Sequence, residues 1–297
     1  MSRLAVLSDA QWARIEPLLP SSVGQRGRPF RDHRQVVEGI VFRFRTGVAW
    51  RDLPAAFGPW QTVWKRHRRF SADGTWDRIH ARLLAEADAA GEVDWNVSVD
   101  STINRAHQHA TNLPRALGGA QGERSNYKNP RGEPPDHAIG RSRGGLSTKI
   151  HHASDGRGRP LAILVGPGQG HDSPMFPYLL AAIAVPRIGP GRARTRPDRV
   201  LGDKAYSSRA NRALLRARGV VAVIPEPADQ QTNRKRRGRH GGRPVGFDAE
   251  IYKGRNVVER SFNTLKQWRG LATRYDKLAL TYRGGAVLCA IVSWLRQ

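Results

Sequence analysis

The chain has 297 residues, of which 50 are Lys or Arg and 25 are Asp or Glu, giving a formal net charge of +25. This length can hold one large domain or two modest ones, each with its own core, and we expect two. So large an excess of basic residues indicates a polyanionic partner. The charge alone does not distinguish DNA binding, ribosomal-type RNA binding and attachment to an acidic membrane surface.

A membrane span and a cysteine-based framework are both excluded. The most apolar stretch, Ala286 to Leu295, is too short to cross a bilayer, and the N-terminus lacks a signal-peptide pattern. Cys289 is the single cysteine and lies within that stretch, so neither an intrachain disulfide nor a multi-cysteine zinc site can form. We therefore expect a soluble intracellular protein.

Helices dominate the predicted N-terminal region, residues 1–90. Ser8 and Gln11 have the spacing of a capping box and open the first helix. Apolar residues recur at helical spacing from His33 to Thr46, and another helix is predicted from Thr75 to Ala90, with Gly91 marking its end.

A helix-turn-helix is the most attractive interpretation of residues 49–70. A short helix, a turn at Gly58 and a second helix opened by Pro59 follow one another. The second helix carries side chains that suit groove edges and phosphates: Gln61, Thr62, Lys65, Arg66, Arg68 and Arg69. A small helical domain whose basic residues are merely solvated explains the same pattern equally well.

Two aspartates are predicted at the ends of strands. The alternation from Trp95 to Asp100 indicates a strand that ends at Asp100, and the short apolar run from Arg199 leads into a loop at Asp203. Strand-end carboxylates can ligate a metal, but they also serve ordinary turns. After Asp203 a helix to Arg218 and a further strand complete a parallel unit.

Between these strands lie a long polar segment and a hairpin. Residues 103–145 form a basic insertion, which we expect to face DNA and to order on binding. His107 and His109 within it lack a metal-ligand spacing. Strands at 146–153 and 161–165 are joined by an Asp-Gly turn, and the next helix is expected to be capped by Asp172 or Ser173.

One narrow helical stripe gathers charged and polar side chains near the C-terminus. It consists of Tyr252, Arg255, Glu259, Asn263 and Lys266. An ordinary surface ion pair accounts for Arg255 and Glu259, although a carboxylate among cations also suits a site for metal and phosphate. Just before it, the run from Gln230 to Arg243, with Arg234 and Arg236, is expected to be a mobile basic loop that contacts phosphates.

The spacing Tyr252, Arg255, Glu259, Lys266 resembles the signature of bacterial insertion-sequence DDE transposases. The N-terminal segment is similar to the helical module that precedes the catalytic domain in the fifth numbered insertion-sequence family. His171 and Asp172 resemble a family motif near the active site. The resemblance implies that Asp100, Asp203 and Glu259 are catalytic metal ligands for two Mg²⁺ or Mn²⁺ ions.

The resemblance also implies an architecture and a function. An all-α helix-turn-helix-like domain (residues 1–90) would precede an α/β ribonuclease H-like domain (residues 91–297) with a mixed sheet flanked by helices. The chain would be a nucleoid-associated DNA transposase of the cytoplasm that cleaves and joins double-stranded DNA as a homo-oligomer. Arg255 and Lys266 would hold phosphates and Tyr252 would orient a nucleotide. A non-catalytic DNA-binding regulator and a ribonuclease H-like nuclease without strand transfer are the alternatives.

Overall fold

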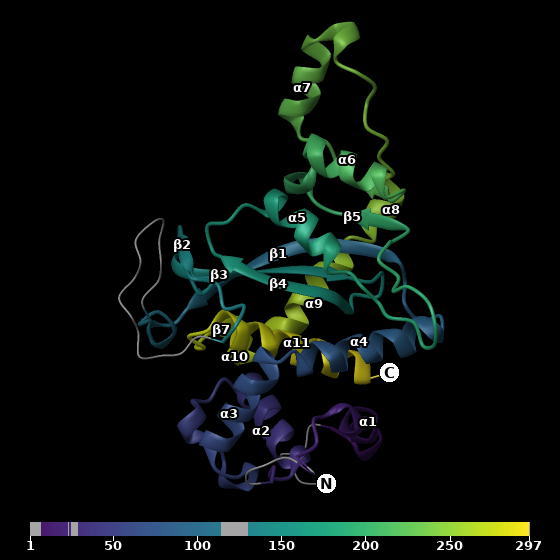
Figure 1. The fold of residues 1–297 in the computed structure, drawn as a ribbon. Coiled ribbons are helices and arrows are strands. Elements are labelled where there is room, and N and C mark those ends of the chain that lie inside the picture. The colour runs from purple at the N-terminus through teal and green to yellow at the C-terminus, as the bar shows by residue number, and fades with distance from the viewer. Residues whose placement is uncertain (1–6, 23, 25–28, 114–129, 297) are drawn as a thin grey trace.

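A mixed β-sheet lies at the centre of the computed structural model, which describes residues 7–22, 24, 29–113 and 130–296 (Figure 1). The strands are β1 Asn96–Ala106, β2 Gly140–Ser142, β3 Gly145–Ser154, β4 Pro160–Pro167, β5 Arg199–Leu201, β6 Val221–Val223 and β7 Thr273–Arg274. The helices are α1 Asp9–Ile15, α2 His33–Thr46, α3 Trp60–Ala72, α4 Thr75–Ala89, α5 Asp172–Ala181, α6 Arg209–Ala217, α7 Ala228–Arg236, α8 Ala249–Lys253, α9 Asn256–Lys266, α10 Arg269–Ala272 and α11 Ala279–Leu295.

The sheet has the order β4-β3-β1-β5-β6, with the short β2 beside β3 and the short β7 beside β1. β1, β3 and β4 are antiparallel neighbours, whereas β5 and β6 run parallel to β1. The predicted hairpin and the predicted strand-helix-strand unit are therefore both confirmed. Asp155 closes the hairpin turn by accepting hydrogen bonds from the backbone N–H groups of Arg157 and Arg159.

Helices cover both faces of the sheet. α5 contacts β3 and β4 on one face, while α9 contacts β1 and β3 on the other. The apolar α11 packs between the sheet and the N-terminal helices α3 and α4, as Figure 1 shows. Because Val37, Val97 and Ile291 belong to the same buried cluster, one continuous core joins the N-terminal helices to the sheet.

The N-terminal helices begin and end close to the predicted positions. The Ser8–Gln11 capping box is formed, α2 ends at Gly47 in the left-handed region, and Gly58 has the positive φ of 80° that the turn before α3 requires. The short helix before that turn consists of two 3₁₀ turns, Trp50–Asp52 and Ala55–Phe57.

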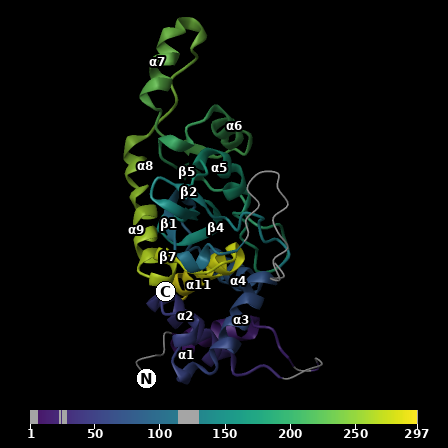
Figure 2. The same cartoon turned by 90° about the vertical axis from the view of Figure 1, so that its left-hand side faces the viewer.

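Three expectations about elements are corrected. β1 does not end at Asp100 but continues to Ala106, and β2 begins at Gly140, so the predicted insertion at 103–145 is shorter at both ends. Part of it, residues 114–129, lies outside the described residues. The basic run from Gln230 to Arg243, expected as a loop, is helical up to Arg236 as part of α7, which projects away from the sheet in both views (Figures 1 and 2).

No helix in the described part of the chain is long and apolar enough to cross a membrane.

Candidate active site

Asp100 lies in the middle of β1, at the point where the neighbouring strand ends. β5 pairs with β1 only from Asn96 to Ser98, so the Asp100 carboxylate lies just past the end of β5. The strand runs on because its later residues pair with β3 in an unbroken register up to Arg105. Although β1 continues past it, Asp100 remains accessible, with 18% of its side chain exposed.

Asp203 lies beside it, two residues after β5. It caps a 3₁₀ turn, Lys204–Tyr206, by accepting a hydrogen bond from the backbone N–H of Ala205 at 2.9 Å. Gly202 precedes it, and a β-carbon there would come within 3.2 Å of side-chain atoms of Val99 and Tyr206. The absent side chain thus lets the backbone before Asp203 pass close to β1.

The Arg255 guanidinium joins Asp100 to Glu259. One terminal nitrogen bonds Asp100 Oδ2 at 2.5 Å and the other bonds Glu259 Oε1 at 2.7 Å. The stretch expected as one helix is two, α8 and α9, with Gly254 and Arg255 between them, and Figure 2 shows the two segments following one another along one side of the molecule. Arg255 is thereby placed at the start of α9, facing the sheet.

Burial and neighbouring charges shift the pKa values of Asp100 and Tyr252. Burial is the main cause that raises the pKa of Asp100; hydrogen bonding from Ser101 N–H and the charge of Arg255 oppose the rise, and Asp203 and Asp172 add to it. Burial likewise raises the pKa of Tyr252, with contributions from Asp203, Asp100 and Glu259. The three predicted acidic residues therefore surround one region, together with Arg255 and Tyr252.

The donor set suits a hard divalent cation. Among the described residues no group of three or more His, Cys, Asp or Glu side chains is close enough to hold a metal ion as the chain stands. Between Asp100 and Glu259 the positive charge is supplied by Arg255, which bonds both carboxylates. Because every acidic donor offers oxygen alone, Mg²⁺ or Mn²⁺ fits the site better than zinc.

Asp172, which the resemblance placed near the active site, lies in this region. The sequence also predicted Asp172 or Ser173 as the cap of α5, but His171 is the N-cap residue and makes no side-chain cap. Asp172 Oδ1 instead accepts hydrogen bonds from Ser101 Oγ at 2.6 Å and Lys149 Nζ at 3.0 Å. The sequence did carry a signal for these contacts, because alternation along β1 and β3 places Ser101, Lys149 and His151 on the same face of the sheet.

The remaining residues of the stripe lie farther along α9. Lys266 is exposed in its last turn, seven residues after Glu259 and so about 10 Å along the helix axis. His107 and His109 lie away from the carboxylates, just past the end of β1, where their rings contact each other at 4.6 Å between centroids.

The predicted DNA-binding side chains of α3 divide into two groups. Gln61, Lys65 and Arg69 are exposed. Arg66 is buried, contrary to expectation, because it stacks on Phe30 at 4.0 Å and bonds His33 Nδ1 at 2.9 Å. Its guanidinium is thus used inside the protein.

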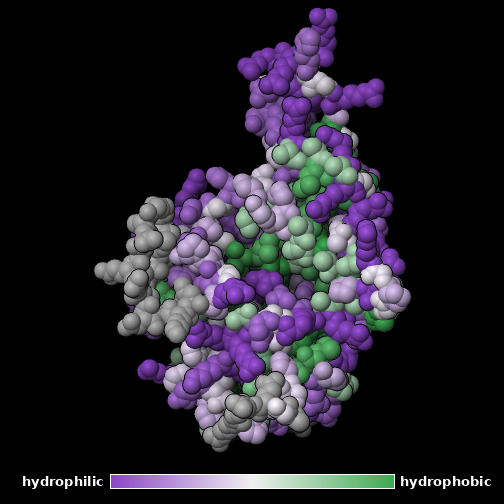
Figure 3. Space-filling model, in the orientation of Figure 1, coloured by the Kyte–Doolittle hydropathy of each residue, from purple (hydrophilic) through white to green (hydrophobic). Residues whose placement is uncertain are grey.

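On α7, Arg236 is exposed, whereas Arg234 forms an ion pair with Glu226 at 3.0 Å. Hydrophilic side chains cover this projecting element (Figure 3).

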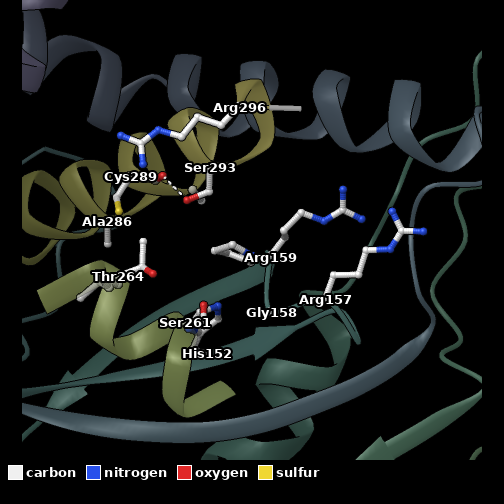
Figure 4. A pocket seen from close by; sticks show the side chains of 13 residues that line it. His152, Arg157, Gly158, Arg159, Ser261, Thr264, Ala286, Cys289, Ser293 and Arg296 are labelled. Carbon is white, nitrogen blue, oxygen red and sulfur yellow. Dashed lines mark hydrogen bonds between the residues drawn. The ribbon is translucent and has the colours of Figure 1, made fainter. Parts of the chain in front are cut away.

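A cavity of about 230 Å³, separate from the carboxylates, lies between α9, α11 and the β3–β4 turn (Figure 4). Its lining includes Arg157, Arg296, Cys289 and Ser293, and no carboxylate. Burial raises the pKa of the Cys289 thiol to about 12, so the thiol is not a nucleophile at neutral pH. This cavity has no part in the acidic site.

Comparison with known proteins gives matches over most of the chain. A family described as "Putative transposase of IS4/5 family" matches residues 7–80, and the transposase DDE domain family matches residues 93–293. No solved structure matches.

Three curated relatives come from bacteria. An insertion element IS402 uncharacterized 16.2 kDa protein of Burkholderia cepacia is 42% identical over 34% of this chain and 74% of its own length. The uncharacterized protein y4sN of Sinorhizobium fredii is 40% identical over 38% of this chain and 86% of its own length. A putative transposase for insertion sequence element IS6501 of Brucella ovis is 29% identical over 51% of this chain and the whole of its own. Since the DDE family covers more than half of a chain whose strand and helix carboxylates converge around Arg255, this protein belongs to the transposase DDE domain family.

Proposed function

We propose that the chain is a DNA transposase that binds the ends of an insertion sequence and carries out metal-dependent strand cleavage and strand transfer. The observation that carries the proposal is the convergence of Asp100, Asp203 and Glu259, from three separate elements, around the Arg255 guanidinium. A protein that only bound DNA would need cations at this place rather than three carboxylates.

The sheet supports this proposal. Its five main strands follow the order third, second, first, fourth, fifth, with the first three antiparallel and the last two parallel, which is the order expected for a ribonuclease H-like domain. In that arrangement the middle of the first strand, the end of the fourth and a helix that comes after the fifth meet. Asp100, Asp203 and Glu259 occupy those three places.

Each residue has a distinct role in the proposed reaction. Asp100, Asp203 and Glu259 would hold two divalent metal ions. When bound, such ions would supply Lewis-acid activation of the attacking oxygen and stabilisation of the leaving oxygen of a phosphodiester. Arg255 bonds Asp100 and Glu259 in the free protein and would exchange them for a DNA phosphate. Tyr252 is half-buried beside it and would orient a nucleotide, with Lys266 on a phosphate farther along α9.

Other surfaces would hold the rest of the DNA. Gln61, Lys65 and Arg69 on α3 and Arg236 on α7 are exposed polar or basic side chains. Two element ends must be joined in one reaction, so we also propose a homo-oligomer on DNA, in the cytoplasm with the nucleoid.

The test is cleavage of DNA that carries the element's own ends, with and without Mg²⁺, followed by product analysis. The proposal expects Mg²⁺-dependent nicking at the ends and joined products, both lost in Asp100→Asn and Glu259→Gln while DNA binding persists. Binding without any nicking would favour a regulator, and nicking without joined products would favour a nuclease. Undiminished cutting by either variant would overturn the assignment.

A further inference from the structure

A groove opens next to the candidate active site, on the α5 side of the sheet. Its volume is about 920 Å³, and it lies between the β2–β3 hairpin and the loop that leads into α5. The lining residues used below are Ile103, Arg141, Arg143, Lys149, Asp172 and Ala205.

The groove begins close to the acidic site. Ala205, at one end, follows Asp203 by two residues, and Asp172 bonds Ser101, the neighbour of Asp100 in β1. Successive side chains of a strand point to opposite faces, so Ile103 and Ser101 face the groove while Asp100 faces α9. The groove and the acidic site therefore meet at the edge of β1 where β5 has ended.

Positive charge in the groove is free to act on a ligand. Arg141 and Arg143 are exposed, and neither has an ion pair within the described part of the chain. The acidic lining residue, Asp172, is already bonded by Lys149 Nζ at 3.0 Å and by Ser101 Oγ. A polyanion entering the groove therefore meets two guanidinium groups that have no ion pair among the described residues, and such groups favour phosphate.

The groove also offers an apolar contact. Ile103 is 48% exposed, and among the described residues that line the groove the ring side chain is that of His171 rather than a Phe, Tyr or Trp. Binding by phosphate contacts and one aliphatic side chain would tolerate any base.

The walls of the groove are already in place. A β-carbon on Gly168 would collide with Ser147 Oγ, so the loop before α5 sits directly against the hairpin. Lys149 Nζ also donates to the carbonyl oxygen of Gly170 at 2.7 Å, which ties the same loop to β3. A ligand would not have to order these walls first.

We propose that this groove holds the single DNA strand that continues from the scissile phosphate, with Arg141 and Arg143 on successive phosphates. The proposal rests on the function proposed above and adds a place for the strand once it leaves the duplex. The duplex itself would bind to the exposed basic surfaces outside the groove.

The test compares two fluorescent DNA probes with the full-length protein, in buffer with chelator so that no cleavage occurs. One probe is a blunt duplex and the other is the same duplex ending in about four unpaired nucleotides on each strand. We expect the forked probe to bind about tenfold more tightly to the unaltered protein, equivalent to roughly 1.4 kcal/mol. Arg141→Ala/Arg143→Ala should lose that gain and keep its affinity for the blunt duplex.

A salt titration adds a second measurement. Two lost phosphate contacts to a single strand should reduce the slope of log K against log salt by about 1.4 for the forked probe alone. The matched control is Arg187→Ala/Arg192→Ala, which removes two exposed arginines that do not line the groove and should keep the preference for the fork. Ile103→Glu, at an exposed position, should lose the preference as the arginine variant does.

Equal binding of both probes by the unaltered protein, or a forked-probe preference that survives Arg141→Ala/Arg143→Ala, would overturn the groove proposal. So would an equal loss for both probes, because the arginines would then serve duplex binding. Failure of the protein to bind either probe would instead contradict the proposed transposase function.

Discussion

Two Arg–Asp ion pairs in this molecule show how a structural contact differs from a functional one. Arg43 and Asp276 are joined at 2.9 Å with only 2% and 4% of their side chains exposed, and Arg43 also stacks on Phe44 and Trp50. Arg255 and Asp100 are joined at 2.5 Å with 17% and 18% exposed. The first ion pair is closed to solvent, whereas the second is open to it.

Their surroundings differ as well. The first pair links α2 to the segment before α11. The second brings one guanidinium to Asp100 and Glu259, with Asp203 and Asp172 near enough to raise the pKa of Asp100. An excess of carboxylates around one cation costs stability and is typical of functional sites, so we propose that Arg255 exchanges these carboxylates for a ligand. The predictions below test this contrast.

The largest effect is expected on the reaction itself. Asp203→Asn keeps the size of the side chain and its capping oxygen but removes a negative charge, and we expect cleavage of element-end DNA to fall by about 10³-fold. Gel assays of nicked product measure the rate. Asp198→Asn is the control, because this exposed residue pairs only with Arg194, and it should cleave at the unaltered rate. Equal rates in the two variants would contradict a role for Asp203.

Breaking the sealed pair should affect folding more than chemistry. Arg43→Ala leaves the Asp276 carboxylate buried without its partner, and we expect the free energy of unfolding to fall by about 3–5 kcal/mol. Arg255→Ala should change it by no more than about 1 kcal/mol, since its partners are partly exposed, yet should impair cleavage. Denaturant unfolding followed by fluorescence measures both. Equal destabilisation by the two substitutions would remove the contrast.

The interface beside Arg43 should also be sensitive to acid. His67 accepts from Trp76 Nε1 on Nδ1 and donates from Nε2 to the Thr281 carbonyl, and its burial lowers the pKa to about 4. The unfolded chain binds this proton near pH 6.5, so the stability contribution is complete above that pH and is lost as the pH falls towards 4. Between pH 7 and 5 the loss should be about 2 kcal/mol.

His67→Gln should therefore show a shallower dependence of unfolding free energy on pH, by that amount. His109→Gln alters an exposed ring and serves as the control. An unchanged dependence in His67→Gln would show that this ring does not titrate with unfolding.

The smallest effect is expected on α3, where Arg69 is exposed to solvent and Arg66 is buried. Arg69→Ala removes an exposed charge and should lower the salt slope of DNA binding by about 1 without affecting specificity. Arg66→Ala removes a buried stack on Phe30 and should destabilise the protein instead. Salt titrations and unfolding curves for both variants decide the matter, and a salt-slope change for Arg66→Ala alone would reverse the assignment.

Local patterns in the sequence predicted most elements, because capping residues, glycine turns and apolar periodicity act over short distances. Ser8, Gly47 and Gly58 are examples. The end of β1 was misplaced because pairing with β3, a long-range contact, extends the strand past a polar stretch. The burial of Arg66 depends in the same way on Phe30, which lies far from it in the sequence.

The candidate site was predictable as a set of residues but not as an arrangement. The spacing on α9 singled out Arg255 and Glu259, and the strand-end pattern singled out Asp100 and Asp203. That Arg255 would reach across to Asp100, and that Asp172 would bond Ser101 rather than cap its helix, depends on how α9 and α5 pack on opposite faces of the sheet. Tertiary packing of that kind has no local signature.

Binding of Mn²⁺ is the measurement closest to the central claim that Asp100, Asp203 and Glu259 form one cation site. Electron paramagnetic resonance of the free ion, titrated with protein and end DNA, reports binding without requiring any cleavage. Each of Asp100→Asn, Asp203→Asn and Glu259→Gln should weaken binding by at least about tenfold, while Asp198→Asn should not. Equal binding of Mn²⁺ by all four variants and the unaltered protein would contradict the account.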